Sequence, residues 1–198
     1  MEKKILREWI GLDVTPDLIK ESREKNGGKI VIPGIFQKAE TKNQNGRIYP
    51  KSVLMREAEN YQKAIRENRA VGELDHPENS TVSLQNVSHV IREMHWDGDT
   101  LKGQLEILST PKGKILESLL ESGVKVGISS RGVGSTEKTN EGIDMVQPDY
   151  QIICFDAVSE PSTPGAYLFA EGKKIDVLSI KLSKADRIFR ALNDIVLK

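Results

Sequence analysis

Hydrophobic and polar positions along the chain change their spacing several times, and each spacing predicts an element. Two segments carry apolar residues at helical intervals: Leu54, Ala58, Tyr61 and Ile65 in the first, and Ile115, Leu116, Leu119 and Leu120 in the second. The first predicts an amphipathic helix over about residues 51–67. The second predicts a helix with an N-cap at Thr110, proline at its first position and an end at Gly123.

Strands are predicted where β-branched and aromatic residues cluster between turn signals. The runs are residues 29–36, 70–74, 87–96, 100–108, 124–130 and 150–158. Asp97-Gly98-Asp99, between two of these runs, predicts a tight hairpin. The last run is apolar almost throughout, which favours a central position in a sheet.

These elements divide the chain into three parts. Residues 1–28 are charged and end at Gly27-Gly28, so we expect a mobile leader with one short helix. Residues 29–172 form the main domain, and residues 173–198 form a C-terminal segment in which Ser183 caps an amphipathic helix. Strands outnumber helices without strict βαβ alternation. This mixture favours an α+β fold: an antiparallel-rich β-barrel, closed or nearly closed, with flanking helices.

Composition narrows the class of protein. The 198 residues are 37% hydrophobic, which suits one compact domain with a real core. Lys+Arg and Asp+Glu are both 29, so net charge gives no reason to expect nucleic acid or an anionic membrane as partner. The single cysteine, Cys154, excludes an internal disulfide framework. No membrane-spanning run or secretory signal is present, so we expect a soluble, intracellular protein.

Reactive side chains stand at three predicted strand ends. His76 precedes a proline, Ser129 and Ser130 precede Arg131-Gly132, and Asp156 interrupts an apolar strand. Each has an ordinary interpretation as a turn or edge residue. A buried carboxylate is costly unless it is paired, so Asp156 either points outward or orients a histidine. Together the segments supply a nucleophile, a base and an orienting acid. The backbone at Arg131-Gly132 is our candidate for an oxyanion hole.

A resemblance joins these segments. Residues 45–50, 72–77, 127–135 and 156–164 resemble, in this order, blocks of the prohead core proteases of tailed phages. The T4-like branch is the most similar, and the family is related to the herpesvirus assemblins. The resemblance covers about residues 29–168. It implies a helix-wrapped β-barrel and a serine endopeptidase that cleaves scaffold, core and major capsid proteins during head maturation, inside the prohead within the bacterial host cytoplasm.

Carried over by block, the resemblance implies roles for individual residues. His76 is the base, Ser129 is the nucleophile with Ser130 as the alternative, and Asp156 is the third member. Arg131 is expected to polarise the substrate carbonyl or hold the active-site loop, unless it makes a surface ion pair. The block at residues 45–50 is interpreted as packing and turn structure. We expect no cofactor or metal, and a homo-oligomer.

The same family resemblance implies cleavage after glutamate in a Leu/Ile-x-Glu context. The leader holds two such sequences, Leu6-Arg7-Glu8 and Ile19-Lys20-Glu21, so we predict self-cleavage there. Matches that end at Glu67, Glu93 and Glu121 lie inside predicted elements. A histidine base also predicts that activity rises with pH as His76 loses its proton.

Two other functions compete with the protease. The first alternative is a metal-dependent hydrolase, although the sequence has no motif with the ligand spacing of zinc sites. The candidate ligands are Asp75, His76, His89, His95, Asp97, Asp99 and Cys154. The hairpin explains Asp97 and Asp99 better, whereas His89 and His95, six apart on one strand, are expected to share a face. The second alternative is a non-enzymatic capsid assembly or scaffold protein on the same fold, with the C-terminal helix as its contact face. The presence of all three catalytic positions argues against it.

Overall fold

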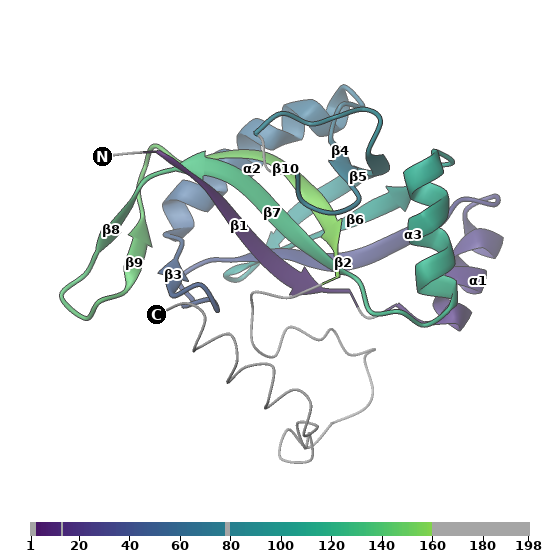
Figure 1. The fold of residues 1–198 in the computed structure, drawn as a ribbon, viewed down its shortest axis with the longest axis horizontal. Coiled ribbons are helices and arrows are strands. Elements are labelled where there is room, and N and C mark those ends of the chain that lie inside the picture. Colours follow the sequence, from purple (N-terminus) through teal and green to yellow (C-terminus); the bar gives the residue numbers. More distant parts are fainter. Residues whose placement is uncertain (1–2, 13, 78–79, 160–198) are drawn as a thin grey trace, which may run out of the picture. The chain divides into compact units, whose positions relative to one another are not determined.

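The computed structural model of the chain describes residues 3–12, 14–77 and 80–159 (Figure 1). Residues 173–198, with the helix predicted after Ser183, lie outside the described residues. In chain order the elements are β1 (Lys4–Gly11), α1 (Pro16–Lys25), β2 (Val31–Lys38), β3 (Arg47–Ile48), α2 (Lys51–Arg66), β4 (Val71–Glu73), β5 (Val87–Asp97), β6 (Thr100–Ile107), α3 (Pro111–Glu121), β7 (Gly127–Gly134), β8 (Thr136–Lys138), β9 (Asp144–Val146) and β10 (Gln151–Val158).

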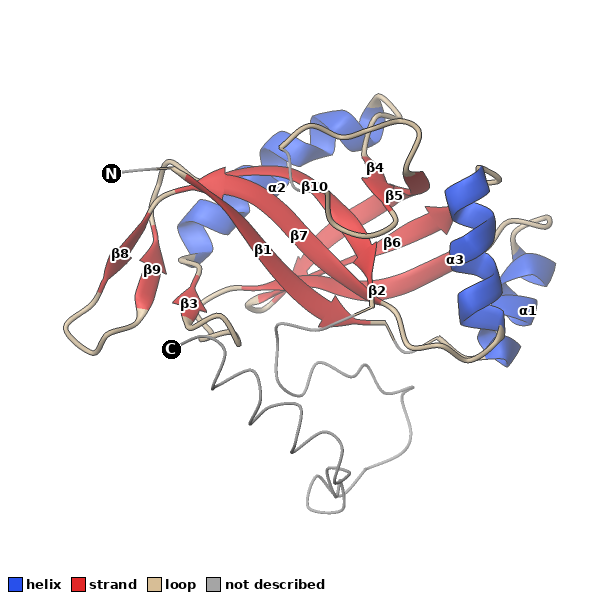
Figure 2. Ribbon diagram, in the orientation of Figure 1, coloured by secondary structure: helices blue, strands red, loops and turns tan. Residues whose placement is uncertain are grey.

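The described strands form three sheets. A four-stranded antiparallel sheet has the order β2-β6-β5-β4, and a three-stranded antiparallel sheet has the order β1-β7-β10. The small third sheet, β3-β9-β8, contains one parallel pair. Figure 2 shows the β1-β7-β10 sheet crossing over the four-stranded sheet, with α1 and α3 together at one end. The fold is therefore α+β, as predicted.

No closed barrel forms among the described strands, so this part of the prediction is wrong. The two larger sheets meet at a single parallel bridge between Leu74, just after β4, and Ala157 on β10. A longer ladder does not form because the backbone N–H of Glu73 donates to the Asp156 side chain instead of to a backbone carbonyl. The side chain that stops the ladder lies at the centre of the candidate site.

Strand β10 is also not central within its own sheet. That place belongs to β7, which pairs with β1 on one side and β10 on the other. Strand β10 is apolar because both of its faces are covered, with Cys154 to Ala157 fully buried. On one face the Phe155 ring packs edge-on against Phe36 and Tyr61 in the main core. Burial on two faces therefore does not require a central strand.

Elements with local end signals are confirmed. Helix α2 spans the predicted residues. Helix α3 begins where expected, because the Thr110 hydroxyl accepts a hydrogen bond from the backbone N–H of Gly113. The hairpin between β5 and β6 turns at Gly98, whose φ is 57°. The apolar face of α3 is narrower than predicted, because Leu116 and Leu120 are buried whereas Ile115 is 47% exposed.

The segment expected to be a leader with one short helix contains a helix and, in addition, a strand. Strand β1 pairs along its whole length with β7. Its buried residues Leu6, Glu8 and Ile10 alternate with the more exposed Ile5 and Arg7, which is a strand period that the charged composition concealed. Helix α1 packs against α3 through ion pairs of Arg23 with Glu117 and Glu121. Residues 4–11 thus supply the edge strand beside β7.

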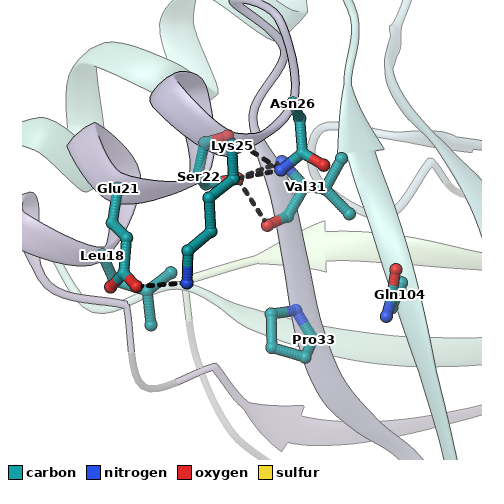
Figure 3. A pocket seen from close by; sticks show the side chains of 8 residues that line it. All are labelled: Leu18, Glu21, Ser22, Lys25, Asn26, Val31, Pro33 and Gln104. Atoms are coloured by element: carbon teal, nitrogen blue, oxygen red, sulfur yellow. Dashed lines mark hydrogen bonds and ion pairs between the residues drawn. The ribbon is translucent and has the colours of Figure 1, made fainter.

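Helix α1 also protects the exposed edge of β2, as Figure 3 shows. The Ser22 hydroxyl donates to the carbonyl of Val31 and accepts from its N–H, at 2.8 Å in each case. Two residues on, Pro33 has no N–H to leave unpaired on that edge. No helix in the described ranges is long and apolar enough to span a membrane.

Candidate active site

His76 joins Asp156 and Ser129 through its two ring nitrogens. The distance from Nδ1 to Asp156 Oδ2 is 2.8 Å, and the distance from Nε2 to Ser129 Oγ is 2.6 Å. An ionised carboxylate only accepts hydrogen bonds, so Nδ1–H donates to Asp156. Nε2 then carries the lone pair and accepts from the Ser129 hydroxyl. The three predicted residues are brought together in the order acid, base, hydroxyl.

Strand register places two of the three side chains. Ser129 on β7 and Asp156 on β10 are directly opposite each other, so their side chains leave the sheet on the same face. His76 comes from the loop after β4. This loop turns at Asp75, which has a positive φ of 64° and donates its backbone N–H to the carbonyl of Ala157. Aspartate tolerates this left-handed conformation better than most residues do.

Asp156 is fully buried and surrounded by donors. Oδ1 accepts from the backbone N–H of Glu73 at 3.0 Å, and Oδ2 lies 2.8 Å from Nε of Arg131. Burial alone would raise the pKa of Asp156, but the hydrogen bonds from His76 and Glu73 and the charge of Arg131 hold that pKa below its usual value. The carboxylate is ionised at neutral pH, and the outward-facing alternative is excluded.

Comparison with known proteins decides the family. The model of the prohead core protein serine protease family matches residues 13–175. The chain belongs to this family. The chain is 34% identical to the prohead core protein protease of Enterobacteria phage T4. This match extends over 143 residues, which are 70% of this chain and 68% of the relative. The solved structure of the bacteriophage T4 capsid assembly protease gp21 matches with a TM-score of 0.70 and 29% identity, over 81% of this chain and 100% of that one.

Membership makes the chain a serine protease of phage head maturation. The family match begins at residue 13, inside the segment expected to be a leader, and so extends beyond the resemblance found in the sequence. The non-enzymatic alternative is set aside, because the family is one of enzymes.

Arg131 lies behind the acid of this prohead protease and is fully buried. Its NH2 group donates to Glu73 Oε2 at 2.8 Å and contacts Cys154 Sγ at 3.0 Å, while its Nε pairs with Asp156. Burial excludes a surface ion pair. The guanidinium is thus engaged with Asp156, Glu73 and Cys154, and its effect on the site passes through Asp156. Glu73 in turn accepts from the backbone N–H of Ser83 and ties in the loop that carries His76.

The predicted oxyanion turn at Arg131-Gly132 does not form, because β7 continues to Gly134. Gly132 pairs with Leu6 on β1 and Ile152 on β10, three residues along the strand from Ser129. A Cβ at Gly132 would lie 2.5 Å from the Tyr150 ring, so glycine is required there for packing. The turn on which the oxyanion role was argued is therefore absent, and that role for Arg131 and Gly132 stays a prediction.

Ser130, the alternative nucleophile, points to the opposite face of β7. Its hydroxyl is buried and accepts a hydrogen bond from Gln37 Nε2 at 2.9 Å. Neighbouring residues of a strand alternate between faces, so Ser130 cannot share the hydroxyl position of Ser129 beside His76. The geometry favours Ser129.

The block at residues 45–50 holds a carboxylate that the sequence singled out only as the end of a candidate cleavage sequence. Glu8 on β1 is 1% exposed and accepts from Asn45 Nδ2 at 2.8 Å, Arg47 NH1 at 2.8 Å and Tyr49 OH at 2.9 Å. The block therefore fastens β1 to the body of the protease. The sequence signal for the burial of Glu8 is its position: Glu8 stands two residues from Leu6 and two from Ile10, so in a strand all three share one face.

The candidate metal ligands do not gather. Among the described residues, no group of three His, Cys, Asp or Glu side chains could hold a metal ion. His89 is fully buried, with Nδ1 2.9 Å from the Ser88 hydroxyl and Nε2 3.0 Å from the Phe155 carbonyl. His95 is exposed and pairs with Glu93. The two histidines do not share a face, because a bulge between Ile91 and Glu93 shifts the register of β5.

Proposed function

We propose that this protease cleaves scaffold, core and major capsid proteins inside the prohead, with Ser129 as its nucleophile. The observation that carries the proposal is the His76 ring, which contacts both Asp156 and Ser129 at hydrogen-bond distance. The T4 relative is named a prohead core protein protease, which supports substrates of this class. The place of action is then the prohead in the host cytoplasm.

In the proposed reaction, Ser129 Oγ attacks the carbonyl carbon of the scissile peptide bond as its proton passes to His76 Nε2. The imidazolium is stabilised by Asp156 through Nδ1–H. His76 then gives the proton to the leaving amine, and the acyl-enzyme forms. Water attacks this ester with His76 again as base, which releases the acid product and restores the Ser129 hydroxyl.

The surroundings of Asp156 suit this role. An acid that became protonated would lose its hold on the Nδ1–H tautomer and leave Nε2 without its lone pair for Ser129. The positive charge of Arg131 and the N–H of Glu73 keep the carboxylate ionised. The ionised state of Asp156 is thus maintained by Arg131 and Glu73, which lie behind the acid.

We further propose cleavage after glutamate, with self-processing in residues 1–28. Of the two candidate sites, Leu6-Arg7-Glu8 lies within the paired strand β1 with Glu8 buried, whereas Glu21 is exposed on α1. A protease binds its substrate in an extended form, so either site must first unfold locally. Since α1 has fewer partners to lose than β1, Glu21 is the site expected to be cut first. A homo-oligomeric state stays a prediction.

The test compares Ser129→Ala with Ser130→Ala on a purified scaffold or core protein substrate. We expect Ser129→Ala to lower kcat/KM by about 10³-fold or more, because the nucleophile is lost. Ser130→Ala removes a buried hydrogen bond to Gln37 on the other face, so its activity should stay within about tenfold of the wild type. Equal activity of Ser129→Ala and the wild type would reject the proposed nucleophile.

A further inference from the structure

Arg7 on β1 lies on the nucleophile face of the sheet. Arg7 is directly opposite Arg131, two residues from the position opposite Ser129. Directly opposed residues, and residues two apart on one strand, send their side chains to the same face. The guanidinium of Arg7 accordingly donates to the carbonyl of Pro77, next to His76, at 2.7 Å.

The charge of Arg7 is not compensated within the described part of the chain. No carboxylate there forms an ion pair with it, and its buried Nε has no hydrogen-bond partner. Asp156, and Glu73 behind it, are already paired with Arg131. A half-buried guanidinium with an unused donor therefore faces the site, where a buried unpaired donor is costly until something accepts from it.

We propose that Arg7 is the specificity-determining residue that binds the acidic side chain of the substrate beside the scissile bond. The proposal rests on the proposed function, in which cleavage follows glutamate. A carboxylate matches the planar fork of a guanidinium in charge and in shape, whereas a glutamine amide matches neither fully. Charge-assisted hydrogen bonds of this kind correspond to about 10- to 100-fold in kcat/KM between the two substrates.

The experiment uses the full chain and two peptides that copy residues 16–25, one with Glu21 and one with Glu21→Gln. For the wild type we expect kcat/KM to be about 10- to 100-fold higher on the Glu peptide. In Arg7→Gln this ratio should fall to nearly one, mainly through loss of the Glu reaction. Arg7→Lys, which keeps the charge but not the fork, should retain an intermediate ratio.

Two outcomes would overturn the inference. If Arg7→Gln slows both peptides equally, Arg7 only holds the His76 loop or stabilises the transition state. If the ratio is unchanged, another group selects the acid. A wild-type ratio of one would instead reject cleavage after glutamate. Should Arg7→Gln fail to fold, the charge-reversed variant Arg7→Glu is tested on peptides with Glu21→Lys and Glu21→Gln. A higher kcat/KM on the Lys peptide than on the Gln peptide supports the role of Arg7. Equal kcat/KM on the two peptides in folded Arg7→Glu opposes it.

Discussion

At the scale of single residues, the site depends on a buried polar network of three residues, of which only Asp156 takes part in the proposed reaction. Arg131, Glu73 and Asp156 are all fully buried, and each is paired with another of the three. Removing one partner would leave a buried charge without compensation, which costs more than the pair contributes. This network holds the Asp156 carboxylate in position independently of its hydrogen bond with His76.

His89 is the second buried titratable group near the acid. A carbonyl only accepts, so Nε2–H donates to Phe155, the residue before Asp156, and Nδ1 accepts from Ser88. Gly72 lies opposite His89 on β4, and a Cβ there would lie 2.3 Å from Nε2. Complete burial lowers the pKa of His89 to about 4, even though the charge of Asp156 and the Phe155 carbonyl act in the opposite direction.

This lowered pKa predicts a loss of stability in acid. The unfolded chain binds a proton at His89 below about pH 6.5, whereas the folded chain does so only near pH 4. The free energy of unfolding should therefore fall by about 3 kcal/mol as pH drops through this window. Urea unfolding from pH 4 to 7 measures it, with His89→Gln as the matched variant. Identical pH slopes in the two proteins would contradict the prediction.

At the scale of elements, β1 belongs to the active site. It pairs with the strand that carries Ser129, and its Arg7 donates a hydrogen bond to the carbonyl of Pro77, next to His76. Its own anchor is Glu8, held by three donors from residues 45–50. Self-cleavage after Glu21 would separate β1 from the rest of the chain, so its pairing with β7 and the Glu8 anchor would then have to keep it in place.

Glu8→Gln tests this anchor. The change keeps the shape of the side chain but leaves the half-buried Arg47 without its ion pair, so the free energy of unfolding should fall by about 2 kcal/mol and kcat/KM should fall with it. Glu24→Gln, at an exposed position on α1, is the control and should change stability by less than about 0.5 kcal/mol. Chemical denaturation and peptide cleavage measure both effects. An unchanged Glu8→Gln protein would show that β1 is held by other contacts.

At the scale of the whole molecule, local signals were read correctly and long-range pairing was not. The Thr110 cap, the turn at Gly98 and the spacing in α2 are decided by residues within a few positions, so the sequence predicts them. Whether a barrel closes, and whether residues 4–11 form a strand, depends on which distant strands pair. No local pattern encodes the pairing of β1 with β7. The charged residues of β1 favoured a leader because their partners, Pro77 for Arg7 and residues 45–49 for Glu8, lie far along the chain.

The same division holds for the site. His76, Ser129 and Asp156 were found because four blocks stand in family order, and Asp156 also because a carboxylate interrupts an apolar strand. The contacts of Arg7, Glu8 and Glu73 with distant segments were not predicted, since each joins residues at least 37 positions apart. The turn expected at Gly132 was wrong because its glycine serves packing against Tyr150.

The most direct measurement is labelling of the full chain with a fluorophosphonate, followed by mass spectrometry of its peptides. We predict a single adduct on Ser129, formed more slowly as pH falls and lost in His76→Ala, because Ser129 carries the one hydroxyl that contacts the histidine base within the described part of the chain. Ser130→Ala should label like the wild type. An adduct on Ser130, or equal labelling of Ser129 in His76→Ala, would contradict the proposed catalytic arrangement.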